Sequence, residues 1–325
     1  MKKIYFITGG TGSFAKKLIK YLLNNKLSKK IIIYSRDEYK QLQLKEDSLI
    51  NKNLSQIRFL IGDVRDEDRL NFAIQEDIDT VIHSAAMKQV PATEYNPFEA
   101  IKTNILGAQN VIQSCINKNI KKIIALSTDK AAAPINLYGA TKLTSDKLFI
   151  NANFYKGKSR SKFSVVRYGN VMGSRGSVIP LFLSQKKENK IFTITDKDMT
   201  RFNITLKESV EFVLKCEKLM EGGEIFVPKI PSYKILDLLN SISHKPKYKL
   251  IGIRAGEKLH EELITESDSL NTQEFKDYFI IHSSYKKNKF KYKKIFSYNS
   301  KANKNFLTPK QLTNLINKNK GDFEN

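Results

Sequence analysis

Five side chains that can move protons stand close together in the middle of the chain. Thr128, Asp129 and Lys130 come first, and Tyr138 and Lys142 follow after a short gap. Residues four apart lie on one face of a helix, so a helix that holds Tyr138 and Lys142 would point both in the same direction. A phenol beside an amine can remove the proton of an alcohol while another group accepts the hydride. The segment therefore predicts redox chemistry at an alcohol carbon.

The N-terminus carries the pattern of a dinucleotide-binding turn, which would hold the hydride acceptor. Residues 4–8 predict a buried strand, and residues 16–23 predict an amphipathic helix. Between them, Gly9 makes the turn, Gly12 lets the backbone approach a pyrophosphate, and Ala15 lets the helix pack on the strand. The helix N-terminus then presents N–H groups to the phosphates. A flexible glycine loop is the weaker alternative, because both flanking elements are predicted.

The tip of the second predicted strand indicates the kind of nicotinamide cofactor. Ser35 and Arg36 come first and Lys40 follows one helical turn later, a pattern that accommodates the extra phosphate of NADP. Asp37 is the contrary signal, since an acidic residue here can grip the ribose of NAD. With Asp63 and Val64 expected beside the adenine, the predicted NADP-binding residues are Gly9, Thr11, Gly12, Ser13, Phe14, Ser35, Arg36, Lys40, Asp63, Val64, Ser127, Tyr138 and Lys142.

The elements that must position these residues alternate as in an α/β protein. The pattern predicts a Rossmann-like, doubly wound parallel sheet with a smaller α/β substrate-binding part. We expect residues 1–170 to form the NADP-binding domain and residues 171–325 mainly the substrate-binding part, either separate from the first domain or interleaved with it. The predicted strands are 4–8, 31–35, 57–62, 80–84, 122–127 and 163–169, and the helices are 12–25, 38–51, 66–76, 93–118 and 136–154, with a further helix starting at Thr308.

The composition limits the class of protein. The 325 residues carry a net charge of +23, but the lysines are spread along the whole chain, so we predict no nucleic-acid partner. The strongest contrary segment is residues 285–294, where lysines alternate with aromatic rings. Arginine is scarce, and the candidate motifs contain Arg36, Arg175, Arg201 and Arg254, whose rigid forks suit phosphate oxygens.

No segment of the sequence predicts a membrane or a metal partner. No apolar run approaches the ~20 residues that span a bilayer. The two cysteines, Cys115 and Cys216, stand in predicted helices and indicate reduced core thiols in a cytoplasmic protein. No His, Cys and Asp cluster has the spacing of metal ligands. His83, on a predicted buried strand, is expected to be a core residue, and His260, on a predicted helix face, remains open between core and site.

Several segments resemble the extended short-chain dehydrogenase/reductases that act on nucleotide sugars. In particular, the chain is similar to the UDP-N-acetylglucosamine 4,6-dehydratases of the C5-inverting type. The resemblance covers residues 1 to about 282, whereas the Lys/Tyr-rich stretch 283–305 matches nothing and its role is open. Besides the glycine turn and the Tyr138 to Lys142 pair, the matching segments are 34–38, 86–91, 103–107, 126–132, 166–171, 173–178, 199–202, 223–229 and 252–261.

The resemblance implies a hydro-lyase that recycles a tightly bound NADP. Oxidation at C4 of UDP-N-acetylglucosamine makes the C5 proton acidic, water leaves across C5 and C6, and the hydride returns to C6. The implied product is UDP-2-acetamido-2,6-dideoxy-beta-L-arabino-hex-4-ulose, which opens pseudaminic acid biosynthesis. Extended relatives range from dimers to hexamers, so the resemblance also implies a homo-oligomer.

The catalytic residues follow from this chemistry. Tyr138 would take the 4-hydroxyl proton, with its pKa lowered by Lys142 and by the nicotinamide charge. Thr128, or Ser127, would donate a hydrogen bond to the C4 oxygen. By resemblance, the residues around the nucleotide sugar are Lys88, Asn170, Val178, Thr195, Arg254 and Glu257, with Arg254 on the diphosphate and Glu257 on a ribose hydroxyl.

Asp129 and Lys130 would act at C5 and C6. Lys130 would be the base at C5 and must be neutral to act, so we expect burial and nearby positive charge to depress its pKa. Asp129 would protonate the departing C6 oxygen. Retaining dehydratases carry an Asp-Glu pair at these positions, so the Asp-Lys pair indicates inversion. A plain surface turn after a strand is the weaker alternative, because this fold binds ligands at the carboxyl ends of its strands.

Two other functions stay open at this point. A UDP-sugar 4-epimerase, or a dehydratase of another UDP sugar, would share most of these motifs, although Lys130 argues against epimerisation, which needs no base at C5. The other is a nucleic-acid or regulatory binding module on a cofactor fold. The intact Thr128, Tyr138 and Lys142 set opposes the binding module.

Overall fold

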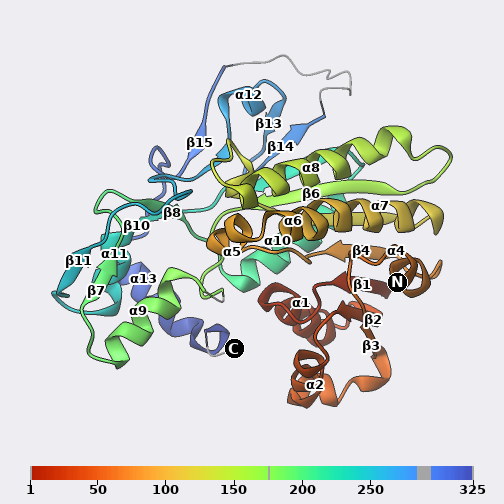
Figure 1. Ribbon diagram of the computed structural model, residues 1–325, viewed down its shortest axis with the longest axis horizontal. Helices are drawn as coiled ribbons and strands as arrows, with labels where there is room; N and C mark the ends of the chain where they lie inside the picture. Colours follow the sequence, from red (N-terminus) through yellow and green to blue (C-terminus); the bar gives the residue numbers. More distant parts are fainter. Residues whose placement is uncertain (1, 175, 284–293, 324–325) are drawn as a thin grey trace.

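The computed structural model describes residues 2–174, 176–283 and 294–323, which form an α/β structure around one nine-stranded sheet (Figure 1). The strand order is β13-β14-β9-β6-β5-β4-β1-β2-β3, and all neighbours are parallel except β13–β14 and β14–β9. This confirms the predicted doubly wound sheet. Its strands are β1 (Lys3–Thr8), β2 (Ser28–Ser35), β3 (Ile57–Ile61), β4 (Thr80–His83), β5 (Lys122–Thr128), β6 (Lys162–Tyr168), β9 (Glu224–Pro228), β13 (Thr272–Glu274) and β14 (Tyr278–His282).

Helices cover the sheet, so its central strands are continuous apolar runs rather than alternating ones. Helices α4, α7 and α8 pack side by side, and α1 packs against α10. Phe6, Ile7 and Ile33 have no exposed surface, which places the main core between strands and helices. The helices are α1 (Ser13–Asn24), α2 (Glu38–Glu46), α3 (Ser48–Asn51), α4 (Glu67–Ala73), α5 (Val90–Tyr95), α6 (Pro97–Ile101), α7 (Gly107–Asn117), α8 (Leu137–Tyr155) and α10 (Leu206–Leu219).

Two predicted helices are wrong in their continuity. The helix expected over 38–51 breaks at Asp47, whose side chain accepts hydrogen bonds from the N–H groups of Leu49 and Ile50 and so starts α3. The helix expected over 93–118 is interrupted before Pro97, and a π-helical turn over Lys102–Leu106 precedes α7. Proline lacks an N–H and clashes with the preceding turn, so it begins α6 instead of continuing α5.

A smaller part lies beside the sheet, at the left in Figure 1, with its own apolar core. Phe182, Leu238 and Leu312 from three of its helices are buried together. The chain between these elements returns to the large sheet through α10, β9, β13 and β14, so the two parts are interleaved. The smaller part and its links comprise α9 (Val178–Lys187), β7 (Phe192–Ile194), β8 (Thr200–Phe202), β10 (Ser232–Lys234), α11 (Ile235–Ile242), β11 (Tyr248–Leu250), β12 (Glu262–Ile264), α12 (Glu266–Ser269), β15 (Tyr298–Asn299) and α13 (Pro309–Lys318).

The segment after α13 reaches back to the dinucleotide-binding half. Lys17 of α1 forms an ion pair with Asp322 at 2.9 Å. Phe323 packs so closely on Gly173 that a Cβ at residue 173 would collide with its ring. The predicted start of α13 is confirmed, since Thr308 and Gln311 form a reciprocal capping box. The ion pair of Lys17 and Asp322 and the packing of Phe323 on Gly173, which we call the clasp, hold the segment after α13 against α1 and the loop after β6.

The described residues contain no helix that is long and apolar enough to cross a membrane. Cys115 and Cys216 are buried free thiols, as expected for core residues.

Candidate active site

A cleft of about 510 Å³ opens along the carboxyl ends of the parallel strands. Every residue predicted to bind the cofactor lines it, and so do all five predicted catalytic residues. Lys88 and Asn170 line it as well, from the segments after β4 and β6. Ligands bind outside the carboxyl ends of the strands in open α/β sheets, and this cleft is therefore the candidate active site.

The turn between β1 and α1 has the geometry that a dinucleotide needs. Gly9 has φ +64°, and a Cβ there would lie 2.8 Å from the Ala85 nitrogen, so only glycine fits. Gly12 is the N-cap of α1, and no side chain caps this helix. The first N–H groups of α1 therefore point to the cleft without a competing side-chain acceptor, which suits a pyrophosphate.

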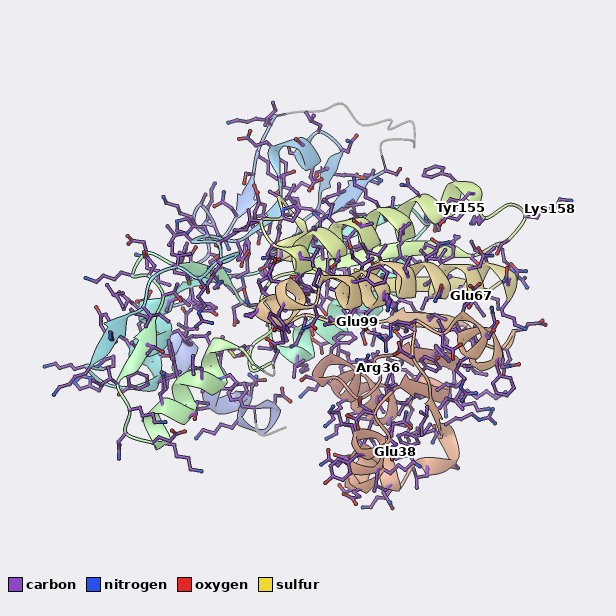
Figure 2. All side chains as sticks on the ribbon, viewed as in Figure 1. Arg36, Glu38, Glu67, Glu99, Tyr155 and Lys158 are labelled. Atoms are coloured by element: carbon purple, nitrogen blue, oxygen red, sulfur yellow. The ribbon has the colours of Figure 1, made fainter. Side chains whose placement is uncertain are left out.

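Charged side chains surround the tip of β2. Arg36, whose side chain is 57% exposed, lies 3.5 Å from Asp63. Asp63 also pairs with Arg65, which in turn pairs with Glu99. Figure 2 labels Arg36 and Glu99. Asp37 caps α2 by accepting the Lys40 N–H at 2.9 Å, and it also pairs with the Lys40 ammonium. Asp37 is thus committed to protein donors, while the Arg36 guanidinium faces solvent at the cleft.

The start of α8 brings Tyr138 against the end of β5. Asn136 caps α8 by accepting the Gly139 N–H at 2.8 Å. A Cβ on Gly139 would fall well inside 3.0 Å of the Lys130 carbonyl, so glycine lets α8 pack directly on the turn that carries Lys130. This contact places the Tyr138 phenol beside the turn that carries Thr128, Asp129 and Lys130.

The environment of Tyr138 corrects one expectation. Burial raises the pKa of Tyr138 to about 12, although the Lys130 charge and a hydrogen bond to Thr128 oppose the rise. The protein groups therefore raise the pKa of Tyr138, and the predicted lowering is wrong in the absence of the nicotinamide charge. Burial also lowers the pKa of Lys142, and the charge of Asp146, one helical turn later, opposes this effect. Ser127 donates to Asp146 at 2.7 Å, so its hydroxyl proton is committed to the protein.

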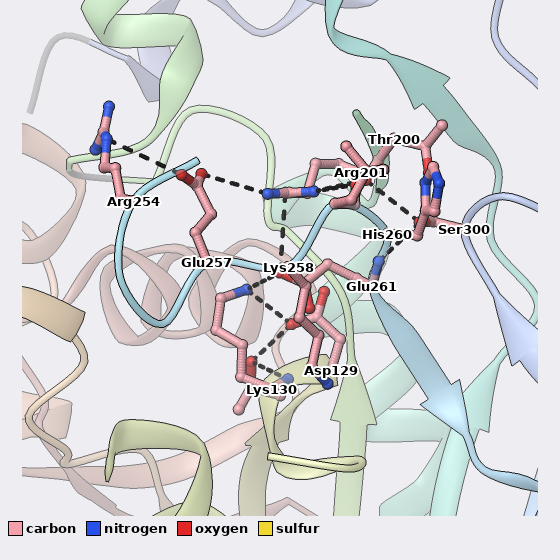
Figure 3. A network of polar contacts seen from close by, with 12 residues as sticks. Asp129, Lys130, Thr200, Arg201, Arg254, Glu257, Lys258, His260, Glu261 and Ser300 are labelled. Carbon is pink, nitrogen blue, oxygen red and sulfur yellow. Dashed lines mark hydrogen bonds and ion pairs between the residues drawn. The ribbon is translucent and has the colours of Figure 1, made fainter. Parts of the chain in front are cut away.

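Lys130 lies between two buried carboxylates, which contradicts the expected neutral amine. Its nitrogen is 3.0 Å from Asp129 and 3.0 Å from Glu261, and its side chain is only 22% exposed (Figure 3). Burial disfavours the ammonium, but the two carboxylates outweigh it and raise the pKa of Lys130. Burial, reinforced by Glu261, raises the pKa of Asp129 despite the Lys130 charge. A raised pKa suits the predicted role of Asp129 as an acid.

Glu261 is a residue of the site that sequence reasoning missed. It stands directly before β12, which packs against the turn of Asp129 and Lys130, and it is 2% exposed. Arg201 on β8 lies 3.8 Å from Glu261 and 3.4 Å from Glu257, so a line of alternating charges runs from Arg254 to Asp129 (Figure 3). Arg201, which was expected to suit phosphate oxygens, is instead buried against Glu257 and Glu261.

The remaining predicted substrate residues lie outside the cleft lining. Arg254, 58% exposed, approaches Glu257 at 4.0 Å, and Glu257 contacts Arg201. Val178 begins α9 and packs on the smaller core, and Thr195 follows β7 half-buried. These four residues lie on the smaller part and are not brought together with the catalytic group by direct contacts.

The other candidate residues are resolved differently. His83 is fully buried and within 2.9 Å of Thr8, as expected for a core histidine. His260 lies in a bend, not on a helix, and contacts Thr200 at 2.9 Å. Arg175 and residues 285–293 of the Lys- and aromatic-rich segment 285–294 lie outside the described residues. Among the residues that are described, no group of His, Cys, Asp or Glu side chains could hold a metal ion.

Comparison with known proteins assigns the family. A model of the polysaccharide biosynthesis protein family matches residues 5–283. The chain is 52% identical to the inverting UDP-N-acetylglucosamine 4,6-dehydratase of Campylobacter jejuni subsp. jejuni over 98% of both chains, and 43% identical to a UDP-glucose 4-epimerase of Rickettsia bellii over 86% of this chain and 82% of the other. The crystal structure of Pen from Bacillus thuringiensis superposes with a TM-score of 0.89, at 41% identity over 98% of both chains. The chain therefore belongs to the polysaccharide biosynthesis protein family, in the same group as the inverting UDP-N-acetylglucosamine 4,6-dehydratases.

Proposed function

We propose that this protein is an inverting UDP-N-acetylglucosamine 4,6-dehydratase. The observation that carries the proposal is the convergence of Thr128, Asp129, Lys130, Tyr138 and Lys142 on one cleft beside the dinucleotide turn. The substrate is taken from the Campylobacter relative, whose whole length the chain matches. The Asp-Lys pair supports elimination with inversion, since both an acid and a base lie 3.0 Å apart at the strand end.

NADP is the cofactor that we propose for the cleft. Bound there, it would accept the C4 hydride and return it to C6. The uncapped N-terminus of α1 fits its pyrophosphate, and the exposed Arg36 fits its ribose phosphate. Asp37, which would favour NAD, is occupied by the Lys40 N–H and ammonium. The carboxylate of Asp63 would share Arg36 with that phosphate.

The side chains of the cleft divide the proton transfers between them. Tyr138 takes the 4-hydroxyl proton, and Thr128 donates to the C4 oxygen. Lys130 would take the C5 proton after passing its own proton to Asp129 across their 3.0 Å contact, and protonated Asp129 would give that proton to the C6 oxygen, which leaves as water. Lys142, which follows Tyr138 by one turn of α8, would supply positive charge to the nicotinamide end of the cofactor.

The wider setting of the reaction is also proposed. The product would be UDP-2-acetamido-2,6-dideoxy-beta-L-arabino-hex-4-ulose, the first intermediate of pseudaminic acid biosynthesis, made by a cytoplasmic homo-oligomer. Residues 171–325 would contribute the uridine and diphosphate contacts, with Arg254 on the diphosphate and Glu257 on a ribose hydroxyl. The net charge of the chain would serve no nucleic-acid function.

The test is turnover in heavy water. Purified protein with NADP and UDP-N-acetylglucosamine should give a 4-keto-6-deoxy sugar with deuterium at C5 and the L-arabino configuration, followed by NMR. A D-xylo ketone formed first would contradict inversion. Formation of UDP-N-acetylgalactosamine, with hydrogen retained at C5, would favour the second candidate, a 4-epimerase, which the identity to the Rickettsia protein supports.

Replacement of Lys130 tests the proposed base. Lys130→Ala should bind NADP as the wild type does, yet lose C5 exchange by at least about 100-fold, as expected for removal of a general base. The matched control is Lys147→Ala, an exposed lysine on α8. Normal turnover of Lys130→Ala would show that another group removes the C5 proton.

A further inference from the structure

The buried carboxylate of Glu261 has no role in the proton transfers described above. It is nearly inaccessible, and its Oε1 lies 3.0 Å from the Lys130 nitrogen. Its Oε2 is buried without a hydrogen-bond partner among the described residues, and the same is true of Oδ2 of Asp129. Burying a carboxylate costs free energy unless its partners compensate. Lys130 and Arg201, the latter at 3.8 Å, are the cationic partners of Glu261, so this carboxylate is placed to act on the charge of Lys130.

The backbone around Glu261 holds this carboxylate in place. The Glu261 N–H donates to the Ser300 hydroxyl at 2.9 Å, and the Ser300 N–H donates to the Glu261 carbonyl at 2.8 Å. Ser300 also contacts Thr200 on β8, next to Arg201. Three segments distant in sequence thus fix Glu261 against the turn that carries Lys130.

We infer that Glu261 is a positioning residue that holds the Lys130 nitrogen beside Asp129 and keeps one shared proton on that pair. The inference rests on the proposed dehydratase function. The Lys130 Nζ–H bond breaks and an Asp129 O–H bond forms across their 3.0 Å contact, which leaves an amine and a carboxylic acid without changing the charge of the pair. Elimination then moves the C5 proton to Lys130 and the Asp129 proton to the departing oxygen. The pair returns to ammonium and carboxylate.

Glu261 favours the protonated pair because its negative charge raises the pKa of both members. Its own pKa is held low by Lys130 and Arg201, which outweigh its burial, so it stays charged while the pair carries the proton. The titratable and charged groups that act on Lys130 come from every element around it and are Asp129, Glu261, Arg201, Lys258, Tyr138 and Tyr233.

Replacement of Glu261 by glutamine tests whether its charge acts on Lys130. Glu261→Gln keeps the shape of the side chain but removes its charge, so the pKa of Lys130 should fall by about 1 to 3 units. The pH dependence of Lys130 acetylation by acetic anhydride, followed by mass spectrometry on substrate-free protein, should move to lower pH by that amount. The acidic limb of the kcat profile for C5 exchange should move in the same direction.

A matched control separates positioning from folding. Glu217→Gln removes another buried carboxylate that pairs with a lysine, at 2.6 Å from Lys3, at the amino ends of β1 and β4. It should change stability but leave both pH profiles of Lys130 in place. If Glu261→Gln leaves the acetylation profile at its wild-type position, the inference is overturned. If wild-type protein shows no C5 exchange, the proposed function fails, while the acetylation result still decides the role of Glu261.

Discussion

Lys130 shows how the charge of one side chain is set by residues that the local sequence does not contain. Burial and nearby positive charge would both depress its pKa, and on that basis a neutral amine was expected. The partner that reverses the shift, Glu261, enters from a loop far along the chain. The Asp-Lys pair was predictable from its place after β5, whereas the second carboxylate depended on a tertiary contact that no local pattern encodes.

His83 provides a pH prediction at the same scale. Burial, and secondarily the Lys142 charge, lower its pKa to about 3, and its Nε2 has no hydrogen-bond partner in the described structure. As the pH falls, His83 therefore binds a proton near pH 6.5 in the unfolded chain but only near pH 3 in the folded chain. Stability should fall as the pH drops between these values, by up to about 1.4 kcal/mol per pH unit.

Replacement of His83 should flatten this dependence. His83→Asn keeps a hydrogen-bonding group near Thr8 but no longer titrates. Urea unfolding at pH 7 and pH 5 should show a lower stability at pH 7 and a smaller loss on acidification than the wild type. His244→Asn, at an exposed position, serves as the control and should keep the wild-type slope. An unchanged slope in His83→Asn would assign the acid sensitivity to other groups.

At the scale of elements, strands were more predictable than helices. The six predicted strands all occur, because continuous apolar runs between turn residues mark buried parallel strands. The long helix expected over 93–118 is interrupted at Pro97, because proline has no backbone N–H with which to continue the preceding helix. His260 was also expected on a helix face, but it lies in a bend and contacts Thr200 of β8.

The contact of α8 with the Lys130 turn gives a prediction for Gly139. Gly139→Ala would push a methyl group into the Lys130 carbonyl, and such overpacking costs about 1–3 kcal/mol. The shift should separate Tyr138 from Lys130, so the rate of C5 exchange should fall by a larger factor than the loss of folded protein explains. Thermal unfolding and C5 exchange measure the two effects. Gly321→Ala, where a Cβ would meet nothing within 4 Å, is the control. Full activity in Gly139→Ala would show that the turn tolerates movement.

At the scale of the whole molecule, the clasp joins the smaller part to α1. Lys17 and Asp322 are 31% and 16% exposed, so their ion pair should contribute about 0.2–1 kcal/mol to stability. A double-mutant cycle with Lys17→Gln and Asp322→Asn should give that coupling energy by urea unfolding. Because α1 begins at the dinucleotide turn, NADP should also dissociate a few-fold faster from both variants in stopped-flow measurements.

The ion pair of Lys229 and Glu274 is a suitable control for the clasp, because neither residue lies on α1 or in the segment after α13. Lys229→Gln should leave the rate of NADP dissociation unchanged. Equal dissociation rates in Asp322→Asn and wild type would show that the clasp does not restrain the cleft. The interleaving itself was left open by the sequence, because nothing in residues 224–228 distinguishes a strand of the large sheet from one of the smaller part.

The insertion of β9 beside β6 has a consequence for synthesis on the ribosome. Strand β6 is translated well before β9 and β14, which complete its side of the sheet. A nascent chain that ends after β6 therefore exposes an unpaired, apolar strand edge, which is a template for association with other chains. Chaperone binding to ribosome-bound chains should thus peak after residue 168 emerges and decline once residues 224–228 have left the exit tunnel.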